Sequence, residues 1–389
     1  MSPSLFSKLP VPKPDPLFAI GAQAQAAGPS AINGTLGVFM DEEGVPLVFP
    51  SVMKTIEFLG RNLQSFNYSY PPLTGLPKYR EAVTKLLCQD EREVIASIAS
   101  TGGTGALAIN LRLMKMLLGE EHPSVILPSP AWGNHPPVCK WAGFRVLEAP
   151  YIENGVPSVD AVIDLVKRQE KPFGILLQVG CHNPTGLDYT DDQWCSLFDV
   201  LQKKECIVLM DFAYQGFKGE PEEDALPIRL ARERGLTTLV TWSASKNHSI
   251  YGLRTGLAAA FVKDIAEQKT VEGTYSAISR GLHSAAPTFG QEIVALTQER
   301  AQDMWRADLR SARETLMRKR QRMLEKLPPS FHSALSGYGM FAMLPLTEAQ
   351  VNRLKLEHKT FVLLDGRINI GGIPEARIGE LCEKIGRVL

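Results

Sequence analysis

A lysine, two serines and an arginine follow one predicted strand closely enough to serve a single ligand. The apolar, β-branched run at residues 237–241 predicts a buried strand, and Ser243, Ser245, Lys246 and Arg254 follow it. The carboxyl end of such a strand is where open α/β sheets hold ligands. A lysine amine forms an imine with a carbonyl group, whereas hydroxyl and guanidinium groups hold a phosphate dianion. Pyridoxal phosphate carries both groups, so this segment could bind both ends of that cofactor.

Other apolar runs also end in side chains that suit this cofactor. Asp211, Asn183 and Trp132 each follow a short apolar run, and Tyr214 comes three residues after Asp211. Taken singly, each also fits a structural role as a helix cap, a turn residue or part of the core. Together they match one chemistry. A carboxylate keeps a pyridine nitrogen protonated, a tyrosine and an amide bond a phenolic oxygen, and an aromatic ring stacks on the cofactor face.

A glycine-rich turn provides a second candidate anion site. Gly103 and Thr104 lie in a turn that opens a strongly apolar helix, and the amides of such a turn bind phosphate. The turn also matches a dinucleotide fingerprint, with Gly103, Gly105 and Ala108 in the glycine and alanine positions. However, the acidic pair Glu120-Glu121 precedes the next predicted strand, whereas a ribose needs an acid at that strand's far end. A dehydrogenase is therefore the weaker interpretation.

The elements that must position these groups alternate between strands and helices. Strand-like runs are predicted at residues 125–127, 174–179, 206–210, 237–241 and 257–261. This alternation indicates an α/β fold with a mostly parallel sheet and helices on both faces. A long charged helical stretch, either continuous or interrupted, is expected at residues 288–327 and would leave the large domain. Residues 331–389 carry the signals of a smaller domain.

The composition favours small molecules as partners. The chain has 389 residues, 44% of them hydrophobic, which is enough for a large core and a smaller one. Lys plus Arg and Asp plus Glu both number 42, so no net positive field attracts nucleic acid or an anionic membrane.

The cysteines and the N-terminus favour a cytoplasmic protein. Six cysteines show neither a C-x-x-C pair nor a zinc-like spacing with histidine, which indicates reduced thiols and no metal site. Residues 1–18 are polar, with prolines at 10, 12, 14 and 16, and we expect an extended, docked arm there and no signal peptide. No run is long enough to span a bilayer.

Seven short motifs occur in order and together span nearly the whole chain. They are Tyr70-x-Pro72-x-x-Gly75-Leu76, Thr104-Gly105-Ala106-Leu107, Trp132-Gly133-Asn134-His135, His182-Asn183-Pro184-Thr185-Gly186, Asp211-x-Ala213-Tyr214-Gln215-Gly216-Phe217, Ser243-x-Ser245-Lys246-Asn247 and Gly366-Arg367-Ile368-Asn369. With these motifs the sequence resembles the aspartate and aromatic aminotransferases of the pyridoxal phosphate fold type I group. Each motif is short and is weak evidence alone. Together, in this fixed order, the seven motifs are very specific.

The resemblance implies an architecture and an assembly. It implies the fold type I transferase fold, with a mostly parallel sheet of the seven-stranded type in a large domain and a smaller α+β domain. We expect residues 1–46 to form an N-terminal arm and part of the small domain, residues 47–312 the large cofactor-binding domain, and residues 313–389 the small domain. In this family the site is completed only in a homodimer, whose subunits share their active sites.

The resemblance also implies a role for each candidate residue. Lys246 would bind the cofactor aldehyde and, once substrate displaces it, move the proton between the substrate α-carbon and cofactor C4′. Asp211 would pair with the ring nitrogen with His135 behind it, while Tyr214 and Asn183 would bond the phenolic oxygen. The other implied cofactor contacts are Gly103, Thr104, Trp132, Ser243, Ser245, Arg254 and, from the other subunit, Tyr70.

Two arginines are expected to select the substrate. Arg367 matches the family's α-carboxylate arginine, whose planar fork pairs with a carboxylate in a way that lysine cannot. Arg280 matches the residue that reaches across the dimer to the distal carboxylate of aspartate or glutamate, although an exposed surface arginine is the alternative because its flanking match is loose. Gly37, Trp132 and Asn183 complete the implied substrate contacts.

Several positions depart from the family's pattern. Gly102 stands where a serine is usual, His283 where a tyrosine is usual and Ala285 where an asparagine is usual. The segment Val38-Phe39-Met40 lacks the lysine found in strict aspartate enzymes. Because these changes remove polar groups beside the substrate, a less polar pocket should accept aromatic rings. We therefore hypothesise that the enzyme accepts both dicarboxylic and aromatic amino acids.

The reaction expected is transamination with 2-oxoglutarate by a ping-pong mechanism. A decarboxylase or β-lyase would use the same cofactor, since the protein selects the bond that breaks. A non-catalytic regulator on the same scaffold is a further alternative. The two arginines favour transamination, because donor and acceptor must bind in turn, and the presence of Lys246, Asp211, Arg254 and Arg367 argues against a regulator.

Overall fold

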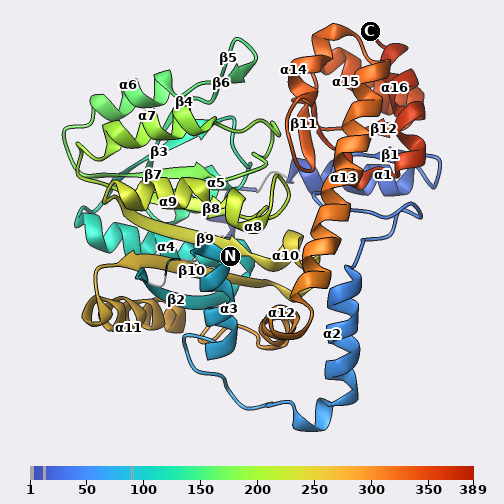
Figure 1. Cartoon of the computed structure of the whole chain (residues 1–389). Coiled ribbons are helices and arrows are strands. Elements are labelled where there is room, and N and C mark those ends of the chain that lie inside the picture. The colour runs from blue at the N-terminus through green and yellow to red at the C-terminus, as the bar shows by residue number, and fades with distance from the viewer. Residues whose placement is uncertain (1–3, 12–14, 89, 91) are drawn as a thin grey trace.

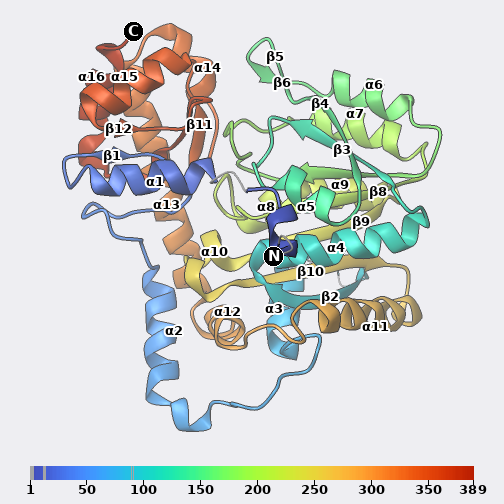
Figure 2. The ribbon, with the colours of Figure 1, turned by 180° about the vertical axis from the view of Figure 1, so that it is seen from behind.

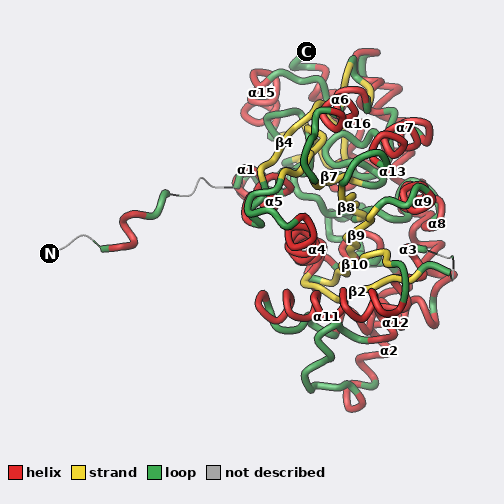
Figure 3. The backbone as a smooth tube through the Cα atoms, turned by 90° about the vertical axis from the view of Figure 1, so that its left-hand side faces the viewer, coloured by secondary structure: helices red, strands yellow, loops and turns green. Residues whose placement is uncertain are grey.

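A computed structural model describes residues 4–11, 15–88, 90 and 92–389 (Figure 1). Two of the prolines in the expected N-terminal arm, Pro12 and Pro14, lie outside these residues. The short helix η1 (Leu5–Lys8) stands clear of the rest of the chain in Figure 3. Leu5 and Phe6 are 76% and 81% exposed, so the apolar side chains of this arm are uncovered in the single chain.

A seven-stranded sheet forms the centre of the larger part. Its strands run in the order β2 (Val94–Thr101), β10 (Thr255–Val262), β9 (Thr237–Ser243), β8 (Cys206–Phe212), β7 (Phe173–Gln178), β3 (Ser124–Ser129) and β4 (Arg145–Pro150). All neighbouring strands are parallel except β10, which is antiparallel to both β2 and β9. The predicted α/β fold and the five predicted strands are confirmed, whereas the edge strands β2 and β4 were not predicted.

The strands form here because apolar residues cover both faces of the sheet. Every residue of β8 is buried, which is typical of a parallel strand between two helical layers. One face carries α4 (Gly102–Leu118), α5 (His135–Trp141) and α11 (Ile265–Leu282), as Figure 2 shows. On the other face, one apolar cluster joins the sheet to residues of α2 (Pro50–Arg61), α3 (Pro77–Leu87), α6 (Asp160–Lys167), α7 (Asp191–Leu201), α9 (Leu226–Glu233) and α12 (Phe289–Arg300).

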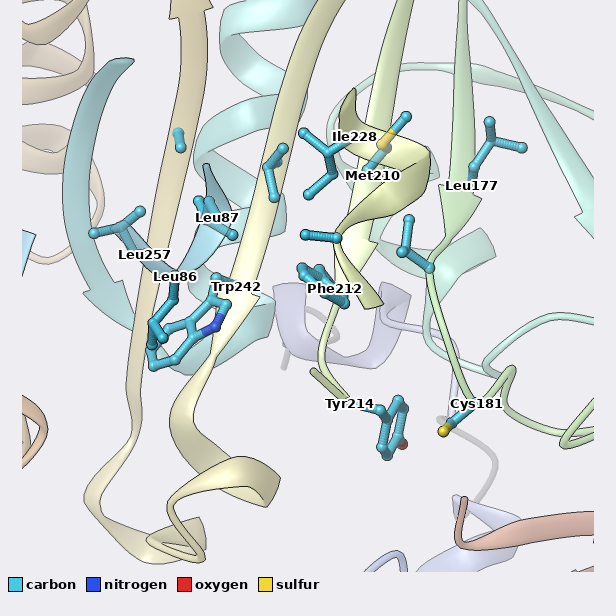
Figure 4. Packing of buried hydrophobic residues seen from close by; sticks show 14 of the residues in the cluster. Leu86, Leu87, Leu177, Cys181, Met210, Phe212, Tyr214, Ile228, Trp242 and Leu257 are labelled. Carbon is cyan, nitrogen blue, oxygen red and sulfur yellow. The ribbon is translucent and has the colours of Figure 1, made fainter. Parts of the chain in front are cut away.

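Figure 4 shows part of this second layer, where Leu86 and Leu87 of α3 lie beside Trp242 and Leu257 of the sheet. Trp242 is fully buried and donates its indole N–H to Gln215 Oε1 at 2.8 Å. Burial of such a ring contributes roughly 2–3 kcal/mol to the free energy of unfolding. The remaining short elements of this part are η2 (Leu63–Ser65), the hairpin β5 (Ile152–Glu153) and β6 (Val156–Pro157), α8 (Pro221–Asp224), α10 (Ala244–Asn247) and η3 (Tyr251–Leu253).

A smaller unit joins the two ends of the chain. It contains α1 (Pro16–Ala26), β1 (Ile32–Asn33), η4 (Pro329–Phe331), α14 (His332–Leu335), β11 (Phe341–Met343), α15 (Glu348–His358), β12 (Thr360–Phe361), β13 (Arg367–Asn369), η5 (Ile370–Gly372), η6 (Glu375–Arg377) and α16 (Ile378–Gly386). The strand β1 pairs in parallel with β12, and β11 pairs antiparallel with β13. Ile32 therefore lies in one apolar cluster with residues of the C-terminal helices.

One long helix connects the two parts. The expected helical stretch at residues 288–327 divides at Ala301 into α12 and α13 (Gln302–Lys326). Leu309 and Leu316 of α13 lie in the large core, while Met323 lies in the small one. The expected domain boundary after residue 312 therefore falls inside a continuous helix. Among the described residues, no helix is both long and apolar enough to cross a membrane, and no cluster of ligating side chains could hold a metal ion.

Candidate active site

A cavity of about 350 Å³ lies at the carboxyl ends of the central strands, between the sheet and the smaller unit. The strand register explains the convergence, because Gln178, Asp211 and Thr241 are paired neighbours on β7, β8 and β9. Twelve predicted site residues line this cavity: Gly37, Gly103, Thr104, Trp132, Asn183, Asp211, Tyr214, Ser243, Ser245, Lys246, Arg254 and Arg367.

Lys246 projects from α10, which begins directly after β9. Its Nζ lies 5.8 Å from the ring centre of Tyr214 and 5.4 Å from that of Tyr251. Burial and the nearby Arg254 guanidinium lower the pKa of Lys246 to about 8, although Asp211 opposes the shift. A substantial fraction of this amine is therefore neutral near physiological pH, as nucleophilic and general-base chemistry requires.

Asp211 is a buried carboxylate near the end of β8. Its Oδ2 lies 2.8 Å from Nε2 of His135, the first residue of α5, so the imidazole holds one carboxylate oxygen in place. The Trp132 ring meets His135 edge-on, with 5.3 Å between ring centres. Since Asp211 also lines the cavity, its carboxylate can accept a hydrogen bond from a protonated group bound there.

Tyr214 and Asn183 form a second polar group in the cavity. Asn183 donates from Nδ2 to Tyr214 Oη at 3.4 Å, and its Oδ1 accepts from Arg367 Nη1 at 3.3 Å. Burial raises the pKa of Tyr214 well above its ordinary value, and the Asn183 hydrogen bond only partly offsets this. Tyr214 therefore keeps its proton and can donate it to a bound oxygen.

Gln178 fixes the backbone at Asn183. With its amide oriented to satisfy both partners, Gln178 donates to the carbonyl oxygen of Asn183 at 3.2 Å and accepts from its N–H at 2.8 Å. Gln178 was not among the predicted site residues, because nothing in the spacing distinguishes it from any other polar residue at a strand end.

The N-terminus of α4 and the segment after β9 bring groups that could hold an anion to the same cavity. Arg254 Nη1 donates to Ser245 Oγ at 3.4 Å, and Ser243 Oγ accepts from the Ser245 amide at 3.3 Å. Gly102 has a φ of 71°, and a β-carbon there would collide with the Arg254 guanidinium. The positive φ and this close approach together favour glycine at position 102. A β-carbon on Gly103 would lie 3.2 Å from that of Ser243, so the turn serves the same cavity as Lys246.

Arg367, the first residue of β13, lines the same cavity next to Asn183. Burial lowers its pKa from the ordinary value, although the guanidinium remains charged under physiological conditions. Its Nε is buried and has no hydrogen-bond partner among the described residues. A partly buried guanidinium with an unused donor is suited to bidentate pairing with a carboxylate.

Two predicted residues lie outside this cavity in the single chain. Tyr70 is 93% exposed, and Arg280, near the end of α11, is exposed and donates to Ser284 Oγ at 2.6 Å. His283 and Ala285 are likewise absent from the cavity lining.

The cavity also has walls made of residues that were not predicted as site residues. They are formed by Leu17, Phe18, Thr35, Leu36, Val38, Leu107, Gln178, Ala213 and Phe341. Phe341 meets Tyr214 edge-on, with 6.1 Å between ring centres. Most of these side chains are apolar, so the space beside the polar groups suits an apolar substrate portion.

Comparisons with known proteins agree with this geometry. The family described as aminotransferase class I and II matches residues 36–385. An aromatic-amino-acid aminotransferase of Escherichia coli is 32% identical, with 92% of this chain and 93% of that protein covered. A cytoplasmic aspartate aminotransferase of Saccharomyces cerevisiae is 31% identical over 100% of this chain and 98% of that protein. The chain belongs to the class I and II aminotransferases.

The likeness extends to solved structures. An aromatic-amino-acid aminotransferase from Burkholderia pseudomallei, covalently bound to pyridoxal phosphate, superposes with a TM-score of 0.94 at 28% identity and covers 99% of this chain and 100% of that one. The fold and the reaction class inferred from the motifs are therefore confirmed.

Proposed function

We propose that this protein is a pyridoxal phosphate-dependent aminotransferase that exchanges amino groups between dicarboxylic or aromatic amino acids and 2-oxoglutarate. The observation that carries the proposal is the convergence of Lys246, Asp211, Arg254 and Arg367 on one cavity. They supply a buried amine, a fixed carboxylate, an anion cradle and a carboxylate-binding fork, which together are what this cofactor and an amino acid need.

The residues of the cavity fit the cofactor group by group. Its phosphate would be held by Gly103, Thr104, Ser243, Ser245 and Arg254, where a glycine turn leaves room that a β-carbon would fill. Asp211 would hold the ring nitrogen, Tyr214 and Asn183 the phenolic oxygen, and Trp132 one face of the ring. When bound, the cofactor supplies an electrophilic carbon for the substrate amine and an electron sink for the broken Cα–H bond.

Lys246 would move the proton. Its amine would hold the cofactor and would be free once a substrate amine took its place. Lys246 Nζ would then be the base that accepts the proton of the substrate α-carbon and gives it back. A pKa of about 8 matches this task, because a base with a pKa near the working pH can both accept and return a proton.

The substrate is expected to bind between the two ends of the cavity. Arg367 would pair with the α-carboxylate, next to its contact with Asn183. The apolar walls around Phe18, Leu36 and Phe341 would accept an aromatic ring, and Arg280 of a second subunit would meet a distal carboxylate. Because one site must receive donor and acceptor in turn, a ping-pong mechanism follows.

Two features support a homodimer with shared sites. Tyr70 and the apolar side chains of η1 are exposed in the single chain. The implied roles of Tyr70 and Arg280 need a second subunit, because neither residue lines the cavity of its own chain.

A cytoplasmic location is part of the proposal. Relatives from Saccharomyces cerevisiae and Caenorhabditis elegans are named as cytoplasmic. All six cysteines are free thiols, which fits a reducing compartment.

The absorption spectrum of the purified protein tests the function. We expect a visible cofactor band that glutamate removes and 2-oxoglutarate restores, and that is absent from a Lys246→Ala variant. A band that does not respond to glutamate would contradict the proposed reaction, and no band after addition of pyridoxal phosphate would contradict the cofactor. Turnover of both aspartate and phenylalanine would support the proposed specificity, whereas strict use of aspartate would exclude it.

A further inference from the structure

One wall of the cavity consists of a segment that belongs to no helix and no sheet. Leu36, Gly37 and Val38 line the cavity, while the side chain of Phe39 is buried in the core on the other side. The segment lies between β1 and α2, so no strand ladder fixes its distance from the substrate. Other contacts must therefore hold this wall in place.

The first anchor comes from the end of β13. Asn369 donates from Nδ2 to the carbonyl oxygens of Leu36 and Val38, the latter at 2.8 Å. Just beyond, the Met40 amide donates to Gly371 O at 3.0 Å. Asn369 follows Arg367 by two residues on the same strand. The wall is thus attached to the element that carries the carboxylate-binding arginine.

The second anchor comes from the turn after Lys246. Tyr251 accepts at Oη from the Phe39 amide at 3.0 Å, across 212 residues of sequence. Ser249 donates from Oγ to Leu47 O, and the Leu47 amide donates to Phe39 O at 2.9 Å. Both ends of the loop that follows the wall are therefore attached to the segment that follows Lys246.

Tyr251 also contacts the catalytic lysine. Its ring centre lies 5.4 Å from Lys246 Nζ, so one side chain touches the amine with its ring and the wall with its hydroxyl. Burial raises the pKa of Tyr251 to about 12, which keeps the hydroxyl neutral at physiological pH. The Oη can thus accept from Phe39 regardless of the protonation state of Lys246.

We propose that Tyr251 is a positioning residue that sets the distance of the wall at residues 36–39 from Lys246, and thereby the fit of the substrate side chain. The inference rests on the proposed function, since it assigns a residue to the same site. Tyr251 contacts the backbone amide of Phe39, so Tyr251 would affect the fit of any substrate that reaches the wall.

The test is a Tyr251→Phe variant, which keeps the ring beside Lys246 and removes only the hydroxyl. Loss of one hydrogen bond is worth about 1 kcal/mol, so amide hydrogen exchange at residues 36–40 should become about five- to tenfold faster. For both aspartate and phenylalanine, KM should rise by a similar factor while kcat changes by less than about twofold.

A matched control is Tyr79→Phe. Tyr79 is fully buried on α3, and its hydroxyl has no hydrogen-bond partner among the described residues. Removal of the Tyr79 hydroxyl should leave both KM and the amide hydrogen exchange at residues 36–40 unchanged. If the control behaves like Tyr251→Phe, the effect is a general loss of packing and the inference fails.

Hydrogen exchange separates this inference from the proposed function, because it is measured without substrate. Unchanged exchange at residues 36–40 in Tyr251→Phe would overturn the inference even in an active enzyme. Faster exchange with unchanged KM would also overturn it, because the wall would then not govern substrate fit. Faster exchange together with a raised KM would support it.

Discussion

Two lysines of this chain are desolvated in different environments. Burial lowers the pKa of both Lys246 and Lys319 to about 8. Lys246 lies in the cavity beside Asp211 and Arg254, where a neutral amine is chemically useful. Lys319 lies inside the protein with its Nζ 5.3 Å from the ring centre of Phe39, and this Nζ has no hydrogen-bond partner among the described residues. The environment of Lys246 suits the proposed reaction, whereas the environment of Lys319 lowers the free energy of unfolding.

Lys319→Met is therefore expected to stabilise the protein. Glu42 and Glu375 oppose the pKa shift that burial causes, and Arg318 adds to it, so a net cost of burying the ammonium remains. Between about pH 8 and 10.5 the unfolded chain binds a proton that the folded chain has released, so the contribution of Lys319 to stability rises with pH across this window. Below it, the full cost of the buried ammonium applies. The variant should gain about 1–3 kcal/mol near neutral pH and less near pH 10.

Urea unfolding at neutral and at alkaline pH measures this gain. The control is Lys269→Met at an exposed position of α11, which should change stability by less than about 0.5 kcal/mol at either pH. A loss of stability in Lys319→Met at both pH values would contradict the interpretation.

Arg367 provides the second prediction at this scale. Arg367→Lys keeps the positive charge but loses the planar fork, so one of two charge-assisted hydrogen bonds to the α-carboxylate should disappear. At about 1.5–3 kcal/mol for such a bond, kcat/KM should fall roughly 10- to 100-fold for every amino acid. Steady-state kinetics with aspartate and phenylalanine measure this, and a loss confined to aspartate would contradict the role in binding the α-carboxylate.

At the scale of elements, α13 links the two cores. Leu309 is fully buried in the large core, and a β-carbon on Gly216 would lie 2.6 Å from its Cδ1. Gly216 follows Tyr214 by two residues, so the helix packs directly behind a strand end that carries a site residue. A change that loosens the packing of α13 is therefore expected to disorder the site residues near Tyr214 as well.

Leu309→Ala should lower the free energy of unfolding by about 2–5 kcal/mol, because it leaves a cavity in a closely packed core. Denaturant unfolding measures the loss. The exposed Leu356 on α15, at 77% exposure, offers a control in which Leu356→Ala should be nearly neutral. Equal effects at the two positions would exclude specific packing of α13 as the cause.

At the scale of the whole molecule, one chain does not gather every residue proposed for the site. Tyr70 and Arg280 do not line the cavity that holds Lys246. If a second subunit supplies them, an inactive subunit can still donate a residue to its neighbour. The two sites of a mixed dimer should then differ.

Mixing Lys246→Ala with Arg280→Ala tests this. Each variant alone should have little aspartate activity, whereas a mixed dimer has one site with both residues intact. After co-refolding equal amounts, half of the dimers are mixed and half of their sites are complete, so activity should recover to about a quarter of the wild-type value. Recovery no greater than the sum of the separate variants would contradict shared sites. Phenylalanine turnover by Arg280→Ala alone should persist, because no distal carboxylate is involved.

The sequence alone determined the chemistry of the site. Lys246, Asp211 and Asn183 follow short apolar runs, and the carboxyl ends of parallel strands meet at one edge of a sheet. Local spacing therefore predicted both the strands and the meeting of these residues, and the ordered motifs predicted the family. Such patterns are local, so they can be recognised without knowing how distant segments pack.

Only the tertiary structure decided the walls of the cavity and what holds them. Phe18, Leu36 and Phe341 come from three separate segments, and Tyr251 reaches Phe39 across 212 residues. No periodicity or motif marks such contacts, because they depend on how segments far apart in the sequence pack together. The same packing brings Ile32 beside Thr360 in one short sheet. The chemical groups of the site could be predicted from local sequence, whereas the shape of the substrate pocket depends on long-range packing.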